Sequence, residues 1–451
     1  MIMLIFVVMN KIQDQLKVKT EATRKLTQQN RKHFALNRAS AGFTTELKEI
    51  TFTLLSDSSE GAYLLDVDGN QYIDLTMGFG SILFGHNYAP IREAIERQLR
   101  QHWSVGPMTP LAGELATKIH EVTGVERVAF FNSGTEAVMV ALRLAKAVTK
   151  KNKIVFFKGA YHGTFDTLLS LKNHPETQLA QEIVPGVTQS ILNESYLLEY
   201  GHENALTFVE QHADEIAAVL VEPVQSRNPS LQPRDFLHEL RSITERLNIA
   251  LIFDEVICGF RIGVGGAQAF FDVKADLVTY GKVIGGGLPI GIVAGKSDYL
   301  DATDGGFWEY GDASIPKVKP TFVAGTFCHH PLAMAASLKV LELLTADNEQ
   351  VLKTLNDKTE KFCQQLNAFF EEEQFPISVS YFASLFRFTT PGKLSLLYNY
   401  LLNNGVYIWE GRNCFLSPGH SDEVLSQLLQ KIKQSAFEME ADGILKRKAI
   451  K

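Results

Sequence analysis

"DLVTYGKVIGGGLPIGIVAG", residues 276–295, places Lys282 between two apolar runs and near three consecutive glycines. Short runs that are almost wholly apolar are typical of strands buried on both faces of a helix-covered sheet. A lysine at the end of such a strand tends to lose its proton, because burial disfavours the charged ammonium group. The neutral amine is a nucleophile toward carbonyl carbons, so this stretch predicts both an α/β fold and covalent chemistry.

The same pattern extends over the middle of the chain, where apolar runs alternate with helical stretches. The further runs are RVAFF (127–131), KIVFF (153–157), AAVLV (217–221) and IALIF (249–253). We therefore expect an open α/β domain with a mostly parallel sheet over residues 90–325. Ligands of such sheets bind at the carboxyl ends of the strands, so the residues that directly follow each run are the candidates for a site.

The flanking segments predict a smaller α+β part. AYLLDVDGNQYIDL (62–75) alternates around DGN, which is a hairpin signal. The other expected elements are helices over 331–372 and 420–440 and strands in SLFRFTT (384–390) and GVYIWEG (405–411). We expect residues 1–40 to form a loose or helical arm, and residues 41–89 and 326–451 to form the two parts of a small domain.

Composition excludes some classes of partner. A formal charge of −7, from 44 basic and 51 acidic residues, argues against nucleic acid, whose binders need a basic face. Four scattered cysteines, none in a CxxC pair or at zinc spacing with histidine, predict no metal site and favour a cytoplasmic location. The first ten residues, MIMLIFVVMN, are too short to span a bilayer, which takes roughly 20 residues. They also lack the basic region and cleavage site of a signal peptide. We expect translation to begin at Met9 and no membrane partner, and a short arm that touches a membrane is the alternative.

The residues after RVAFF predict a helix that begins at a strand end. Ser133 and Glu136 have the S-x-x-E spacing of a capping box, which puts the start of the helix at Ser133, Gly134 and Thr135. The free backbone N–H groups there form a potential anion site. A capped helix that binds nothing fits the same spacing.

Three further strand ends carry aromatic or acidic residues. Tyr161 and His162 follow KIVFF in a glycine-flanked loop, where an aromatic ring either covers a flat ligand or packs against the loop. Glu222 follows AAVLV and Asp254 follows IALIF. Buried carboxylates are costly unless something pairs with them. Asp254 therefore serves a metal, a ribose or a protonated ring nitrogen, or it caps a helix or pairs with an arginine such as Arg261.

Together these strand ends match the needs of pyridoxal 5′-phosphate (PLP). Its phosphate needs the helix start, its ring an aromatic plate, its nitrogen a carboxylate and its aldehyde a lysine. A phosphate-binding loop is the rival, but Val283 follows the lysine where that motif requires serine or threonine. No GxGxxG follows the first strand of the domain, which counts against a dinucleotide.

At this point the sequence resembles a known family. FNSGTEA, YHG, VEPVQ, IFDEV, TYGKVIGGGLPIG and AGTF resemble, in this order, motifs of class III PLP-dependent aminotransferases, over about residues 40–435. The resemblance implies fold type I, with a mostly parallel seven-stranded sheet in a large domain, a small α+β domain built from both chain ends, and a homodimer.

The resemblance also implies roles for single residues. Lys282 corresponds to the Schiff-base lysine, Asp254 to the partner of the ring nitrogen and Glu222 to an acid beside the cofactor. The remaining cofactor-binding candidates are Ser133, Gly134 and Thr135 at the phosphate, Tyr161 and Val256 on the two ring faces, His162 beside Tyr161, and Thr326, which reaches the phosphate of the partner subunit.

Two subgroups share further motifs with this chain. IDLTMGFGSILFGHN, VEPVQSRNPSLQP, YGDASIP and GTFCHHPLA are similar to the aminotransferase domains of polyketide/nonribosomal-peptide synthases. Those domains aminate a β-keto acyl chain held on an acyl carrier protein, whereas this chain is free-standing. DEVICGFR also resembles glutamate-1-semialdehyde 2,1-aminomutases, although these usually have S-G-N-P where this chain has C-H-H-P (328–331).

We expect a PLP-dependent aminotransferase that moves an amino group from an amino-acid donor to a ketone or aldehyde acceptor in secondary metabolism. A carrier-bound β-keto acyl chain is one candidate acceptor. Phe79 aligns with an active-site aromatic and is either a wall of the substrate pocket or a core residue. Glutamate-1-semialdehyde 2,1-aminomutase is the alternative enzyme, and a non-catalytic α/β binding module is the alternative from another class.

Overall fold

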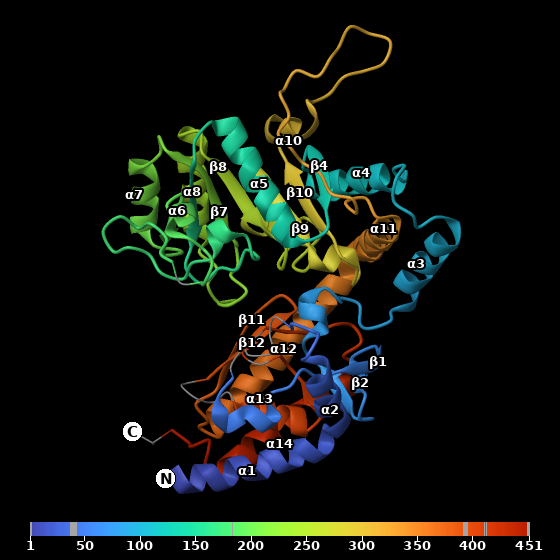
Figure 1. Cartoon of the computed structure of the whole chain (residues 1–451), viewed down its shortest axis with the longest axis vertical. Helices are drawn as coiled ribbons and strands as arrows, with labels where there is room; N and C mark the ends of the chain where they lie inside the picture. Colours follow the sequence, from blue (N-terminus) through green and yellow to red (C-terminus); the bar gives the residue numbers. More distant parts are fainter. Residues whose placement is uncertain are drawn as a thin grey trace.

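Two lobes make up the molecule, an upper one around a large sheet and a lower one that holds both chain ends (Figure 1). The computed structural model describes residues 2–36, 43–182, 184–390, 396–409, 411 and 413–448, and the side chains of residues 11 onward within these ranges. Within the described ranges, no helix combines the length and the apolar character needed to cross a bilayer.

The upper lobe contains a mixed sheet to which seven strands of the described chain contribute, in the order β4-β10-β9-β8-β7-β5-β6. Its strands are β4 (Arg127–Phe131), β5 (Lys153–Phe157), β6 (Ser195–Leu198), β7 (Ile216–Val221), β8 (Ala250–Asp254), β9 (Leu277–Gly281) and β10 (Gly291–Gly295). β10 runs antiparallel to β4 and β9, and the other neighbouring pairs are parallel. The strands other than β10 therefore end at the same edge of the sheet.

Alternate residues of these strands pack on opposite faces of the sheet. Ile252 and Leu220 belong to one core cluster with the apolar face of α5, while Phe253 and Val221 belong to another with α8. Figure 1 shows α5 across one face of the sheet. The helices of this lobe are α3 (Ala89–Gln101), α4 (Leu111–Thr123), α5 (Gly134–Thr149), α6 (Gln189–Leu192), α7 (Glu203–Gln211), α8 (Arg234–Arg246), α9 (Gly266–Phe271) and α10 (Ser297–Asp304), with 3₁₀ turns η3 (Asp166–Leu168) and η4 (Lys282–Gly285). Burial on both faces explains why the strand sequences are apolar throughout instead of alternating.

The lower lobe joins the two ends of the chain. β13 pairs in parallel with β3, so that Val406 lies opposite Ile73. Its strands are β1 (Ser56–Glu60), β2 (Tyr63–Asp66), β3 (Gln71–Asp74) and β13 (Val406–Tyr407) in one sheet, and β11 (Ser378–Phe382), β12 (Leu385–Thr389) and β14 (Cys414–Phe415) in another. Its helices are α1 (Ile2–Lys19), α2 (Glu21–Asn30), α12 (Gln350–Glu372), α13 (Leu396–Asn403) and α14 (Asp422–Ala441), with 3₁₀ turns η1 (Thr45–Ile50), η2 (Met77–Gly80) and η5 (Ala346–Glu349). Helix α11 (Pro331–Thr345) leads down to this lobe and packs against α3, α4 and η4 of the upper lobe.

Most of the predicted elements are present. The six apolar runs are β4, β5, β7, β8, β9 and β10, and the DGN segment joins β2 to β3 in a hairpin. The N-terminal arm is helical, and α1 runs through Met9. The strand expected at 405–411 is short, covering Val406–Tyr407, and Glu410 lies outside the described residues.

Three features were not predicted. β6 was missed, because SYLL mixes polar and apolar residues and covers four positions. The antiparallel direction of β10 was not predicted, because an apolar strand has the same composition in either direction. The helical pattern over 331–372 is divided in two, because Asp347, Asn348 and Glu349 all have φ between 47° and 63°, in the left-handed region that no right-handed helix can pass through.

Candidate active site

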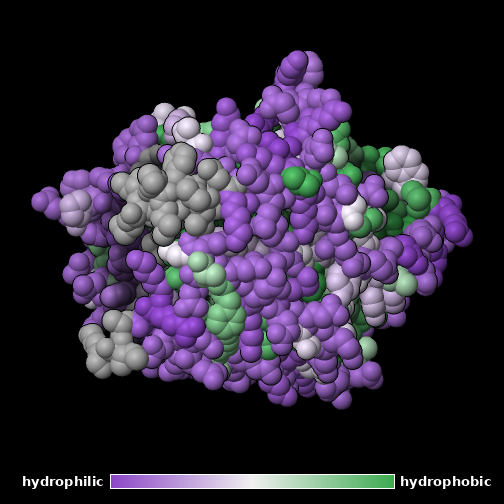
Figure 2. Space-filling view, turned by 90° about the horizontal axis from the view of Figure 1, so that it is seen from below, coloured by the Kyte–Doolittle hydropathy of each residue, from purple (hydrophilic) through white to green (hydrophobic). Residues whose placement is uncertain are grey.

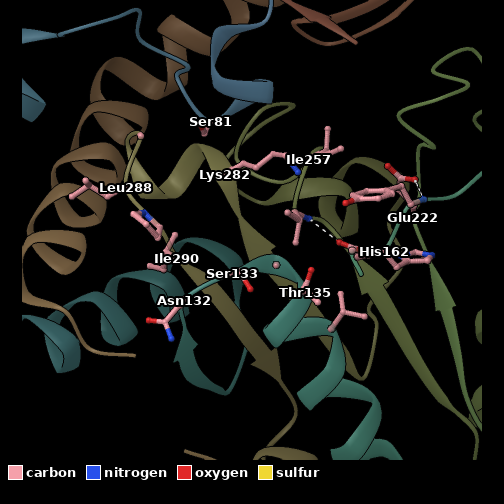
Figure 3. Close-up of a pocket in the computed structure, with 18 residues that line it drawn as sticks. Ser81, Asn132, Ser133, Thr135, His162, Glu222, Ile257, Lys282, Leu288 and Ile290 are labelled. Carbon is pink, nitrogen blue, oxygen red and sulfur yellow. Dashed lines mark hydrogen bonds and ion pairs between the residues drawn. The ribbon is translucent and has the colours of Figure 1, made fainter. Parts of the chain in front are cut away.

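A cavity of about 370 Å³ lies at the carboxyl ends of β4, β7, β8 and β9. The lining side chains include Lys282, Asp254, Glu222, Tyr161, His162, Val256 and the Ser133–Thr135 turn, together with Ser81, Asn132, Ile257 and Leu288–Ile290. In Figure 3 the Lys282 side chain extends above the start of α5, where Ser133 and Thr135 lie, and His162 and Glu222 lie to one side of it. The strand ends that the sequence singled out therefore meet in one place.

Lys282 directly follows β9 and begins the 3₁₀ turn η4. Its φ of 47° is in the left-handed region, which costs a lysine backbone strain. Burial lowers the pKa of the Lys282 amine below its ordinary 10.5, and the Asp254 and Glu222 carboxylates partly oppose that shift. The Lys282 amine is therefore neutral, and so reactive, at a lower pH than the amine of a surface lysine.

Asp254 ends β8 and is almost fully buried. Its Oδ2 lies 2.7 Å from Nδ1 of His162, and its Oδ1 accepts hydrogen bonds from the Val256 N–H at 3.1 Å and the Thr279 hydroxyl at 3.2 Å. These contacts hold the Asp254 carboxylate in place at the end of β8. Asp254 can therefore hold a proton on a ligand nitrogen.

The alternative that Arg261 pairs with Asp254 is wrong. The Arg261 guanidinium is fully buried, stacks over the Phe415 ring and donates to the Gly80 carbonyl and the Ser384 hydroxyl instead. It joins the two lobes behind the cavity, because Gly80 and Ser384 belong to the lower lobe.

The lowered pKa of Lys282 leads to a measurable pH dependence. In cofactor-free protein, we expect acetic anhydride to acetylate Lys282 with a half-maximal rate at a lower pH than an exposed lysine in the same digest. Asp254→Asn should move that midpoint lower still, because the Asp254 carboxylate raises the pKa of the amine. Peptide mass spectrometry over a pH series measures both, and an upward shift in the variant would contradict the assigned contact.

The start of α5 has the capping expected from the sequence, with one difference. The Ser133 hydroxyl accepts the Glu136 N–H at 3.2 Å. The Glu136 carboxylate reaches back to the Asn132 N–H at 2.7 Å, one residue before the position that a capping box predicts. The helix start therefore presents the N–H groups of the Gly134–Thr135 turn to the cavity, where they suit a phosphate.

Two loops beside the cavity are held together through Glu222. Its carboxylate accepts the Tyr161 N–H at 3.2 Å and the Ser226 N–H at 2.9 Å. Burial raises the pKa of Glu222, while His162 lowers it and Asp254 raises it further. Glu222 thus fixes the backbone at Tyr161, whose ring is 42% exposed and so is available to cover a ligand.

Gly163 brings this loop against the phosphate turn and tolerates no side chain. Its φ is 86°, and a Cβ there would lie 2.2 Å from the Thr135 hydroxyl oxygen. We expect Gly163→Ala to lower the free energy of unfolding by about 2–4 kcal/mol and to weaken PLP binding roughly tenfold, because both backbone strain and overpacking act on Thr135. Denaturant unfolding and a cofactor titration measure these effects.

Gly113→Ala is the matched control for that variant. Gly113 lies inside α4 and has nothing within 4 Å of its added Cβ, so the change should leave cofactor binding unaltered and stabilise the helix by up to about 1 kcal/mol. Equal PLP affinity in the two variants would contradict the role given to Gly163.

The cavity suits PLP by its shape and its chemistry. Nε2 of His162 is buried without a hydrogen-bond partner among the described residues, so a polar group belongs near it. Gly134 lets the start of α5 lie close to Val256, since a Cβ there would lie 3.0 Å from that side chain. The Gly134–Thr135 turn would hold the phosphate, Asp254 the ring nitrogen, Tyr161 and Val256 the two faces of the ring, and Lys282 the aldehyde carbon.

Known proteins match this chain over the residues that form the site. Residues 45–434 match the sequence profile of the class-III aminotransferases. The chain belongs to the class-III aminotransferase family. A glutamate-1-semialdehyde 2,1-aminomutase of Francisella philomiragia is 36% identical over 394 residues, covering 82% of this chain and 88% of that protein.

Solved structures of aminotransferases share the fold. An omega-transaminase from Sphaerobacter thermophilus is 26% identical, with a TM-score of 0.82 and coverage of 93% of this chain and 98% of its own. A transaminase with PLP bound is also 26% identical, with a TM-score of 0.84 and coverage of 94% and 99%. Class-III aminotransferases use PLP, and the predictions of fold type I and of this cofactor are confirmed. The chain is an enzyme of this family, which removes the alternative of a non-catalytic binding module.

Two of the predicted site residues lie away from the cavity in the single chain. Phe79 is 39% exposed and its ring lies 5.7 Å from that of Trp409, while Ser81 lines the cavity in its place. Thr326 is exposed and does not line the cavity. The roles of both in this class-III aminotransferase remain predictions.

Other residues of the site were not predicted from the sequence. Thr279, inside β9, donates to Asp254, and Ile257 and Leu288–Ile290 complete the lining. The signal for Thr279 was its hydroxyl within the otherwise apolar run DLVTY, two positions before the strand end.

Proposed function

We propose that this chain is a homodimeric aminotransferase that moves an amino group from an amino-acid donor to a ketone or aldehyde acceptor. The observation that carries the proposal is the amine of Lys282, whose pKa burial lowers, in a cavity shared with the buried carboxylate of Asp254. That pair meets the two needs of amino-group transfer, a nucleophilic amine and a fixed negative charge.

Each residue then has one task. PLP, when bound, supplies an electron sink for the carbanion that forms at the substrate Cα. The Lys282 amine removes the proton at Cα as a general base and, as a general acid, would deliver it to carbon C4′ of the bound cofactor, so that the amino group is left there. Asp254 keeps a proton on the ring nitrogen, and the hydrogen bonds from Val256 and Thr279 hold its carboxylate in place. Tyr161 and Val256 keep water from the faces of the ring.

A donor and acceptor screen tests the proposal. PLP-loaded protein is mixed with glutamate, alanine or an alkylamine, and the change in cofactor absorbance is followed before keto acids, ketones and aldehydes are added. We expect at least one amino acid to convert the absorbance and at least one carbonyl compound to restore it. Failure of every donor would overturn the proposal.

Glutamate-1-semialdehyde 2,1-aminomutase is the second candidate, because several curated relatives with 34–36% identity carry that name. The two activities differ in the need for a separate donor. If the protein isomerises glutamate-1-semialdehyde with no added amine, the aminomutase assignment replaces ours. The C-H-H-P sequence at 328–331 counts against that outcome, since aminomutases usually have S-G-N-P there.

Exposed apolar residues support the homodimer. Figure 2 shows apolar side chains at the right-hand edge, which is the side of α3 in Figure 1, and α3 and the segment after it expose Leu99, Trp103 and Met108. The segment after α10, which projects from the top of Figure 1, exposes Tyr310 at 91% and Phe322 at 82%. Such surfaces are typical of protein interfaces. Thr326 in the same segment would reach the partner's phosphate.

Sedimentation tests the homodimer. We expect the holoenzyme to sediment at twice the mass of the chain, and a monomer would refute the proposed dimer.

The proposal also includes the natural amino acceptor and the cellular compartment of the enzyme. A carrier-bound β-keto acyl chain in secondary metabolism is our candidate acceptor, and the similarity of VEPVQSRNPSLQP to carrier-dependent domains supports it. Acyl-carrier and free acyl substrates compared in the same screen test it. The four cysteines are buried free thiols, which fits the reducing cytoplasm.

A further inference from the structure

Arg227, on the loop after β7, is a half-buried cation for which the described residues offer no carboxylate. Within the described ranges its guanidinium makes no ion pair, and its Cζ lies 5.6 Å from the centroid of the Tyr161 ring. A half-buried charge loses solvation that an aromatic face only partly replaces. Tyr161 lines the cavity with Lys282, so Arg227 contacts a lining residue of the cavity without itself being one of the residues that line it.

The position of Arg227 is fixed by the loops that meet at Glu222. The Glu222 carboxylate binds the N–H groups of Tyr161 and Ser226, the residue directly before Arg227. The Gln225 side-chain amide donates to the Lys158 carbonyl at 2.8 Å and ties the same two loops a second time. Arg227 is therefore held beside Tyr161 by the frame that positions Tyr161 itself.

The described residues that line the cavity include no free cation that could bind a carboxylate of the substrate. Among the described residues that line it, Asp254 and Glu222 are acidic and Lys282 is the one lysine or arginine. Lys282 must be uncharged to react. Arg261 is fully buried and already bound to Gly80 and Ser384, so it is not open to a ligand.

We propose that Arg227 binds a carboxylate of the amino-acid substrate at the mouth of the cavity, so that the enzyme prefers amino donors that carry a carboxylate over simple amines. This inference rests on the proposed function. The planar guanidinium forms two parallel hydrogen bonds with a carboxylate, which a lysine cannot reproduce. The Tyr161 ring below it limits the directions in which it can turn.

Binding of glutarate, a dicarboxylate with neither an amino nor a keto group, tests the inference without turnover. Calorimetry on the PLP-loaded protein should show glutarate binding that Arg227→Gln weakens at least tenfold and Arg227→Lys weakens less. Arg234→Gln is the matched control, since Arg234 also stacks on aromatic rings, those of Phe270 and Phe271, but lies on the surface at the start of α8. Its glutarate affinity should equal that of the wild type.

Kinetics separate substrate binding from a structural role. Arg227→Gln should raise the KM for glutamate about tenfold or more, with little change in kcat, and should leave 1-phenylethylamine unaffected. An arginine that merely holds the Tyr161 ring would affect both donors equally and would shift the cofactor absorbance.

Each result has a defined meaning. Unchanged glutarate affinity and glutamate KM in Arg227→Gln overturn the inference while leaving the aminotransferase intact, and so does an equal loss for both donors. If inorganic phosphate binds the holoenzyme and loses as much affinity as glutarate, the residue is a general anion site and the assignment to carboxylates is wrong. If no donor converts the cofactor in the wild type, the proposed function itself fails.

Discussion

Lys282→Ala should abolish amino transfer, with a loss of at least about 10³-fold in kcat, while the protein stays folded and still takes up PLP. The loss is this large because one amine serves as both nucleophile and proton carrier, and a positioned acid–base group alone contributes 10²–10⁴-fold. Cofactor uptake persists because the Gly134–Thr135 turn, Asp254 and the ring-covering residues are untouched. Stopped-flow absorbance with a donor measures the rate, and thermal unfolding checks the fold.

A mass measurement makes this prediction independent of turnover. Borohydride treatment of the PLP-loaded wild type should fix the cofactor on the chain, and the Lys282→Ala chain should remain unmodified. Lys339→Ala is the matched control, because Lys339 lies on α11 in an exposed ion pair with Glu342. Covalent capture in Lys282→Ala, or wild-type turnover, would show that another lysine reacts.

Asp254→Asn should reduce kcat by about 10²-fold or more with little loss of PLP. An asparagine keeps the shape and can still accept hydrogen bonds from Val256 and Thr279, but it carries no charge to keep a proton on the ring nitrogen. The electron sink weakens, and proton removal at the substrate Cα slows. Single-turnover kinetics with a donor deuterated at Cα measure this step, and an unchanged rate would identify another residue as the nitrogen partner.

Asp276→Asn separates loss of a catalytic charge from loss of any buried carboxylate. Asp276 is also buried, but it pairs with Arg241 and Lys296 and accepts the Leu251 N–H at the opposite end of β8 and β9. The substitution should lower the free energy of unfolding by about 1.5–3 kcal/mol, as expected when hydrogen bonds to a charged group are lost, because Asp276 is buried but its partners Arg241 and Lys296 are partly exposed. At a temperature where the variant is folded, kcat should be unchanged.

The sequence predicted the large sheet and the residues at its edge because both depend on local pattern. Strands buried on two faces are continuously apolar, and in a parallel arrangement their carboxyl ends meet at one edge, so Asp254, Glu222 and Lys282 could be expected in one place. The direction of β10 could not be expected, since an apolar strand reads the same in either orientation.

Contacts between residues far apart in the sequence could not be predicted from local sequence patterns. His162 and Asp254 are 92 residues apart, and Arg261 reaches a carbonyl 181 residues away, so nothing near Arg261 in the sequence shows that it bonds Gly80 instead of Asp254. Phe79 lies in a turn where Met77, Gly78, Phe79 and Gly80 all have positive φ, a conformation that residue preferences do not predict for methionine or phenylalanine.

The parallel pairing of β13 with β3 has a consequence for how the protein is made. Strands β4–β10 lie within residues 127–295, so the large sheet can assemble while the ribosome is still translating the rest of the message. The hairpin of β2 and β3 emerges before that sheet, yet its neighbour β13 is more than 300 positions downstream. At elongation rates of roughly 5–20 residues per second, that hairpin waits tens of seconds for its last strand. This early hairpin is thus among the last parts of the fold to be completed, and that interval is when chaperones would have access to it.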